Sequence, residues 1–172
     1  MNPSHPTEPH VLRLSPLTAA AFAPFGEVVS VEGKQATAVN DGRALRYDKL
    51  VHLTHDTDAA LPALSLYHVS ASTLPVAVDL FEQHPHSGQV FLPMMDGSFL
   101  VVVAPDRDGR PDLDRAQAFL PDVGVGVHYK PGIWHVPMTA LGADVLLAML
   151  MWEGTETATV EHRLAKPILI QA

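Results

Sequence analysis

The chain has 172 residues, 47% of them hydrophobic, which suffices for one core but is short for two domains. It contains no cysteine, which excludes disulfides, thiolate zinc sites and cysteine nucleophiles. The formal net charge is −8 without any basic cluster, so we expect no nucleic-acid partner. No apolar run is long enough to span a membrane as a helix, and residues 1–9 lack the pattern of a secretion signal. We therefore expect a cytoplasmic protein without a membrane partner.

The N-terminal part of the chain predicts a tail, a helix and two strands. Residues 1–10 are rich in proline and have no apolar pattern, so we expect them to be disordered. The pair Ser15-Pro16 is typical of a helix start and predicts a helix over 17–22. The alternating segment 26–31 predicts a strand, and another strand is expected around 45–53.

From residue 64 onward, short apolar or alternating runs are separated by turn residues, which is typical of antiparallel β-structure. The segment 111–120 differs, because its composition is helix-like. The expected strands are 65–70, 76–82, 89–94, 98–104, 125–129, 134–141 and 144–152. No long helices alternate with these strands, so a parallel α/β sheet is excluded. We expect an all-β sandwich or barrel with one or two short peripheral helices.

Two segments carry side chains suited to chemistry. His84 and His86 are two residues apart, so on an extended strand they would point to the same face. Gln89 begins the next expected strand, and His135 follows a turn at 130–132. In a rolled-up barrel, two such strand–turn–strand pieces can meet across the interior. The pattern therefore predicts a polar site built around His84, Gln89 and His135.

These segments resemble the paired motifs of the cupin, or double-stranded β-helix, family. His84-Pro85-His86 is similar to the first motif, and Gly132-Ile133-Trp134-His135 is similar to the second. The resemblance implies one cupin-type catalytic domain over residues 11–172. It also implies a candidate site for a divalent metal at His84, His86, Gln89 and His135. Two departures weaken the metal site: Val78 replaces the usual glycine, and Gln89 replaces a glutamate, although amides are poorer transition-metal ligands than carboxylates.

A larger set of residues resembles the ureidoglycolate lyase family of allantoin breakdown, in preserved order from about residue 14 to residue 153. The matching pieces are Asn40-x-Gly42, Arg46-Tyr47, His84-Pro85, Gln89-x-Phe91-x-Pro93-Met94, 99–105, Pro111-Asp112-Leu113, Ala118-Phe119, Gly126-Val127-x-Tyr129 and Trp134-His135-x-Pro137. The resemblance implies cleavage of (S)-ureidoglycolate into glyoxylate and urea by a homodimer. The family accepts an apolar residue at position 86, so the resemblance disfavours a required metal cofactor.

The implied reaction needs a base for the substrate's hydroxyl proton and an acid for the departing urea nitrogen. Imidazoles can fill both roles near neutral pH, so His84 and His135 are the expected acid and base, in either order. Gln89 offers two donors and an acceptor, which suits the urea group or the hydroxyl.

The substrate's carboxylate needs a cationic or amide-rich clamp. Arg46 is the first candidate, because a guanidinium binds carboxylates through two parallel hydrogen bonds. Lys130 is the second candidate, and Asn40 and Tyr129 are expected to complete the polar lining.

Other interpretations stay open at this point. The histidines could be hydrogen-bonded core residues, and Arg46 could form a salt bridge at the rim. The protein could instead be a metal-dependent cupin oxygenase or isomerase, or a cupin that binds a small metabolite without catalysis. We expect the remaining histidines to be structural or surface residues: His52, His55, His68, His128 and His162.

Overall fold

Strand β9 (Ser98–Ala104) lies at the centre of the fold, because this apolar run is buried on both faces. The computed structural model describes residues 10–154 and 159–172. The odd-numbered residues of β9 from Phe99 onward pack into one hydrophobic cluster, which we call the first core. The even-numbered residues from Leu100 onward pack into another, the second core. The strand therefore separates two cores, one on each side.

The first sheet has eight strands in the order β12-β1-β17-β7-β14-β9-β15-β6, and β12 also pairs with β9. The six strands from β12 to β9 thus form a closed ring around the second core, which contains Phe81, Trp134 and Ile168. Besides β9, the strands of this sheet are β1 (Val11–Pro16), β6 (Ala71–Ser72), β7 (Val76–Gln83), β12 (Gln117–Leu120), β14 (Trp134–His135), β15 (Thr139–Leu141) and β17 (Val160–Gln171).

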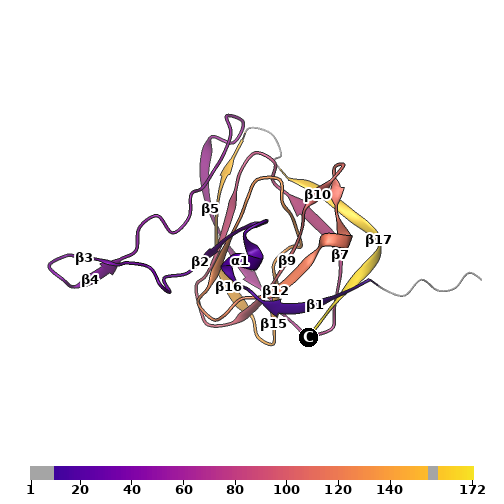
Figure 1. The fold of residues 1–172 in the computed structure, drawn as a ribbon, viewed down its shortest axis with the longest axis horizontal. Helices are drawn as coiled ribbons and strands as arrows, with labels where there is room; N and C mark the ends of the chain where they lie inside the picture. Colours follow the sequence, from indigo (N-terminus) through magenta and orange to yellow (C-terminus); the bar gives the residue numbers. More distant parts are fainter. Residues whose placement is uncertain (1–9, 155–158) are drawn as a thin grey trace, which may run out of the picture.

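The second sheet has the order β2-β13-β8-β16-β5 and packs across the first core (Figure 1). Helix α1 (Ala19–Phe22) adds Phe22 to this core. Strand β5 forms one edge of the sheet and β2 forms the other. The bounds are β2 (Gly26–Val29), β5 (Leu61–Val69), β8 (Gln89–Pro93), β13 (Gly126–Tyr129) and β16 (Val145–Glu153).

Two small hairpins lie outside these sheets. The hairpin of β3 (Thr37–Val39) and β4 (Ala44–Arg46) pairs with neither sheet and extends away from the barrel (Figure 1). The hairpin of β10 (Asp106–Arg107) and β11 (Arg110–Pro111) precedes the 3₁₀ turn η1 (Leu113–Arg115). No helix in the described part of the chain is long and apolar enough to cross a membrane.

The expected all-β, cupin-type barrel is confirmed, and strand 98–104 has the predicted bounds. The other strands expected after residue 64 are present with shifted ends, except that 134–141 divides into β14 and β15. The expected strand over 45–53 is wrong beyond Arg46. The tail expected over 1–10 lies, apart from His10, outside the described residues.

Both helix predictions need correction. The first helix begins at Ala19 and not at 17, and Thr18 caps it by accepting a hydrogen bond from Ala21 N at 3.2 Å. Ser15-Pro16 instead ends β1, which pairs with β12 and β17. The helix-like segment 111–120 contains one 3₁₀ turn followed by β12, because pairing with β1 and β9 outweighs its local helix propensity.

Candidate active site

A cavity of about 500 Å³ lies between the two sheets. Polar side chains from both sheets and from the chain that follows β7 face it, among them Glu82, His84, Gln89, His135 and Glu161. Apolar walls are provided by Phe91, Met149 and Met151 among others. A concave site with a few convergent polar groups is typical of a small-molecule site.

The first sheet positions a carboxylate and two imidazoles side by side. Glu82 on β7 lies directly opposite His135 on β14 in the antiparallel register. His84 follows the end of β7, and its carbonyl accepts a hydrogen bond from Gly132 N at 2.9 Å. Gly132 has a φ of 75°, a conformation that favours glycine, so the turn before His135 depends on this residue. The ring centroids of His84 and His135 are 5.4 Å apart.

Gln89 faces the same cavity from the second sheet. It begins β8, between Tyr129 of β13 and Met151 of β16. Its Nε2 donates only a weak hydrogen bond, to Met151 Sδ at 3.7 Å, and its buried Oε1 has no partner among the described residues. A buried amide oxygen is normally hydrogen-bonded, so this acceptor is open to an N–H or O–H group inside the cavity.

His135 is held in one tautomer and is neutral. Its Nδ1 lies 3.0 Å from Ile133 O, and since a carbonyl only accepts, Nδ1 carries the proton and Nε2 keeps its lone pair. Burial, together with repulsion from His84, lowers the pKa of His135 to about 3. The ring also stacks on Tyr129, with centroids 4.6 Å apart and planes at 11°.

Glu82 and His84 complete the cluster beside His135. Burial and the neighbouring Glu161 raise the pKa of Glu82 above its usual value. His84 Nδ1 lies 3.3 Å from Thr159 Oγ1. Repulsion between the two imidazoles disfavours the state in which both rings are charged.

Three ligand atoms, one each from Glu82, His84 and His135, lie within 4.8 Å of one another. Two imidazoles and a carboxylate fit a divalent transition metal by their chemistry. This set differs from the one expected from the sequence, because Glu82 belongs to it and His86 does not.

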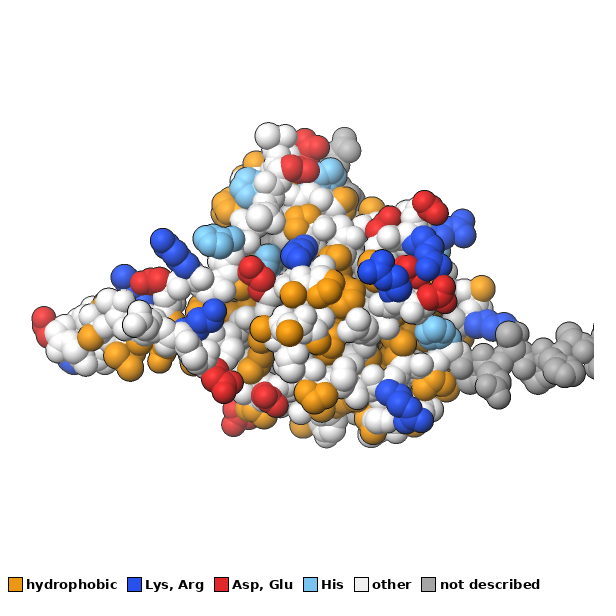
Figure 2. Space-filling model, in the orientation of Figure 1, with side chains coloured by type: hydrophobic (Ala, Val, Ile, Leu, Met, Phe, Trp, Pro, Cys, Tyr) orange, Lys and Arg blue, Asp and Glu red, His pale blue; other side chains and the backbone are white. Residues whose placement is uncertain are grey.

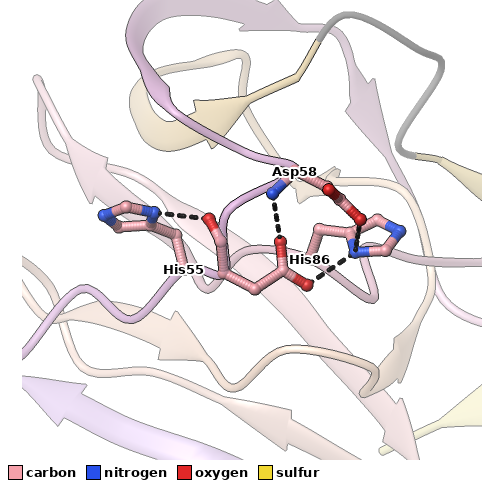
Figure 3. Close-up of polar contacts among 4 residues, drawn as sticks. His55, Asp58 and His86 are labelled. Carbon is pink, nitrogen blue, oxygen red and sulfur yellow. Dashed lines mark hydrogen bonds and ion pairs between the residues drawn. The ribbon is translucent and has the colours of Figure 1, made fainter.

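His86 lies in a different cluster, near the surface (Figure 3). Strand β7 ends at Gln83, so the extended geometry that would align His84 with His86 is lost. His86 Nδ1 instead contacts Asp56 Oδ2 at 2.7 Å and Asp58 Oδ2 at 4.0 Å (Figure 3). The same loop is joined by the backbone hydrogen bond from Asp56 N to His86 O at 3.0 Å. His86 thus fastens a loop and does not contribute to the cavity.

The remaining predicted site residues are not brought into the cavity of this chain. Arg46 and Asn40 lie on the β3–β4 hairpin, and Arg46 Nε donates to Asp48 Oδ2 at 3.0 Å. Lys130 is exposed and donates from Nζ to the Ala23 carbonyl at 2.6 Å. Tyr129 stacks on His135 and does not line the cavity. Its buried hydroxyl has no partner among the described residues, and burial raises its pKa.

Sequence reasoning missed Glu82, Thr159 and Glu161. Glu82 could have been found from the sequence, since it precedes His84 by two residues on an apolar strand. In the structure its side chain is half-buried there. No sequence pattern pointed to Thr159 or Glu161, because β17 was not expected and its place beside β7 depends on a long-range pairing.

Comparison with known proteins agrees with the family resemblance of the sequence motifs. The family model described as ureidoglycolate lyase matches residues 9–171. The ureidoglycolate lyase of Burkholderia cepacia is 40% identical over 134 residues, covering 77% of this chain and 75% of that protein. That of Rhodobacter capsulatus is 38% identical over 160 residues, covering 93% and 98%.

Solved structures give more distant likenesses. A dTDP sugar isomerase from Desulfovibrio desulfuricans is 14% identical with a TM-score of 0.49, covering 82% of this chain and 84% of that one. The RmlC epimerase of Mycobacterium tuberculosis is 20% identical with a TM-score of 0.45, covering 80% and 72%. The match to the family model over nearly the whole chain, together with these sequence relatives, shows that the chain belongs to the ureidoglycolate lyase family.

Proposed function

We propose that this protein is a ureidoglycolate lyase that cleaves (S)-ureidoglycolate into glyoxylate and urea in allantoin breakdown, in the cytoplasm. The observation that carries the proposal is the convergence of His84, Gln89 and His135, which come from separate family motifs, on one cavity between the sheets. The cavity is large enough for a small ureido acid, and it presents the acid, base and amide groups that the reaction needs.

The reacting carbon of the substrate carries a hydroxyl, a urea nitrogen, a hydrogen and the carboxylate. Breaking its C–N bond requires that the hydroxyl proton leave as the carbonyl forms, and that the departing nitrogen gain a proton. One proton is removed and one is supplied, so urea and glyoxylate form without an added reactant. Each proton transfer contributes about 10²–10⁴-fold to the rate.

We assign the base to His135 and the acid to His84. His135 is neutral, and its Nδ1–H bond to Ile133 O leaves Nε2 as the acceptor for the hydroxyl proton. A bound carboxylate beside the ring favours the protonated form, which strengthens His135 as a base only when substrate is present. His84 is the other imidazole of the cluster, with its ring centroid 5.4 Å from that of His135, and so takes the role of the acid.

Gln89 orients the substrate. Its Oε1 accepts from a urea N–H and its Nε2 donates to the urea carbonyl or the hydroxyl, so that both ends of the amide are satisfied. Holding the urea group in this way places the C–N bond between the two imidazoles.

A metal-assisted form of the reaction is the second candidate, because Glu82, His84 and His135 are close enough to hold a divalent ion. Such an ion would polarise the substrate's hydroxyl and lower its pKa. We favour the metal-free scheme, because His135 and His84 can serve the two proton transfers without an ion. We expect turnover to survive chelation. Stoichiometric metal, with complete loss of activity on its removal, would contradict this scheme.

The decisive experiment incubates the purified protein with (S)-ureidoglycolate and measures glyoxylate, urea and ammonia separately. Equal amounts of glyoxylate and urea are expected. Ammonia in place of urea would indicate a hydrolase, and no turnover would leave a metabolite-binding protein.

A further inference from the structure

Among the described residues, the cavity offers the substrate's carboxylate no lysine or arginine, a point that rests on the proposed function. Its lining includes Glu82, Glu153 and Glu161, whereas none of the lining residues in the described ranges is lysine or arginine. An anion placed in an acidic, partly enclosed cavity is unfavourable unless a positive group pairs with it. Lys130 does not supply one, because its Nζ is bonded to Ala23 O on the outside.

The β3–β4 hairpin carries a suitable cation away from its own barrel. It pairs with neither sheet and forms the extension on the left of Figure 1, and Figure 2 shows basic and hydrophobic side chains exposed on that extension. Arg46 at the end of β4 contacts Asp48 through Nε alone. Its two terminal amino groups are therefore left to bind a carboxylate.

Strand β5 presents an apolar surface that is uncovered in the single chain. It is an edge strand that pairs with β16 alone, over nine residues. Leu64 and Leu66 are 71% and 62% exposed, while Ser65 between them lines the cavity together with Tyr67. Long apolar edge strands are normally covered, because they otherwise promote aggregation. The hairpin contributes a matching apolar side chain, since Leu45 is 64% exposed.

We propose that, in the homodimer that the family resemblance implies, the β3–β4 hairpin of each copy (the arm) packs on the β5 surface of the other and completes that copy's site. Leu45 would cover Leu64 and Leu66, and Arg46 would lie at the mouth of the other copy's cavity. Ser65 and Tyr67 of β5 face the cavity, so Leu64 and Leu66 point to the other face of the strand. Leu45 and Arg46 alternate in the same way along β4. A β4 strand laid along the free edge of β5 would therefore place Leu45 beside the leucines and Arg46 on the cavity side. Each site is then complete only in the dimer, and the two-fold arrangement closes on itself.

Complementation between two inactive subunits tests the proposal. Arg46→Ala is expected to lower kcat/KM by about 10- to 100-fold, the loss of a charged hydrogen-bonded contact, with partial rescue in Arg46→Lys. Co-expressed, differently tagged Arg46→Ala and His135→Ala subunits are purified through both tags. Each heterodimer holds one intact cavity faced by one intact arm, so about half of the wild-type activity is expected. Recovery no greater than that of the single variants would overturn the proposal.

Two controls accompany this experiment. A heterodimer of His84→Ala and His135→Ala subunits has a defect in each cavity, so it must stay inactive whichever arm serves it. Arg110→Ala removes an exposed arginine from the hairpin of β10 and β11, which is separate from β3–β4, and should leave activity unchanged. If Arg110→Ala impairs turnover as much as Arg46→Ala, the effect of Arg46 is one of general charge and the proposal fails.

A measurement without substrate separates this inference from the proposed function. The chain has no cysteine, so Leu45→Cys and Leu66→Cys each introduce a single thiol. A short bismaleimide should cross-link a mixture of these two variants into a dimer, and should not cross-link Leu66→Cys with Arg110→Cys. A cross-linked dimer without ureidoglycolate turnover would retain the arm and reject the proposed substrate. A monomeric wild-type protein in sedimentation, or no cross-link, would reject the arm.

Discussion

The cavity around His84 and His135 and the surface cluster of His86, Asp56 and Asp58 begin from one short motif, in which a single proline separates His84 from His86. In the cavity, 7% of His84 is exposed and its imidazole lies next to another imidazole, that of His135. In the surface cluster, 39% of the His86 side chain is exposed and its imidazole contacts the Asp56 carboxylate. Burial lowers the pKa of His135, whereas Asp56 raises that of His86. The comparison shows that surroundings, and not residue type, divide these histidines between the cavity and loop attachment.

The largest expected difference between the two regions is in turnover. His135→Ala removes the neutral acceptor and should lower kcat by about 10²–10⁴-fold, whereas His86→Ala should leave it unchanged. Steady-state kinetics with glyoxylate detection measures both, with circular dichroism as the check on folding. Equal losses in the two variants would show that the clusters act together.

A smaller effect is expected at Gln89. Gln89→Leu keeps the volume but removes the donor and the acceptor, so kcat/KM should fall by about 10- to 100-fold. Gln89→Glu tests the metal question in parallel, because a carboxylate would strengthen a metal site there. If added divalent metal raises the activity of the glutamate variant above that of the wild type, the metal-free scheme is weakened.

The pH dependence of stability should have opposite signs in the two regions. For His135 the folded pKa of about 3 lies below the ordinary 6.5, so the unfolded chain binds the extra proton between these values. Its contribution to the free energy of unfolding is therefore lost as the pH falls below about 6.5. Urea unfolding at about pH 7 and about pH 5 measures this slope, which should be shallower in His135→Phe. An unchanged slope would mean that His135 is not buried in a neutral form.

The smallest effect is expected from His86 and runs the other way. Its folded pKa is raised by Asp56, so its stabilisation is present below about pH 6.5 and is lost as the pH rises through the raised value. His86→Ala should thus destabilise the protein more at about pH 5.5 than at about pH 9. Asp56→Asn, which removes the same ion pair, should show the same trend. Hydrogen exchange at Asp56 N and Gly88 N, which bond His86 O and Thr54 O, reports whether the loop loosens.

Parts of the fold could be predicted because they depend on local pattern. Strand 98–104 is a continuous apolar run between turn residues, and such a run buried on both faces needs no knowledge of its partners. Segment 111–120 could not be placed in this way, since its strand forms through pairing with β1 and β9 from distant parts of the chain. The long strand β17 was missed for the same reason, with a register shift between Arg163 and Ile168 obscuring its alternation.

By itself, the sequence determined the class of fold, the family motifs and the trio of His84, Gln89 and His135, because these depend on residue type, order and spacing. Only the tertiary structure separated His84 from His86, added Glu82 opposite His135, and left Arg46 on a hairpin outside its own cavity. The physical reason is that spacing predicts a shared face only while a strand continues, and β7 stops one residue before His84. Beyond the end of β7, pairing between distant segments decides which charged side chains lie close together.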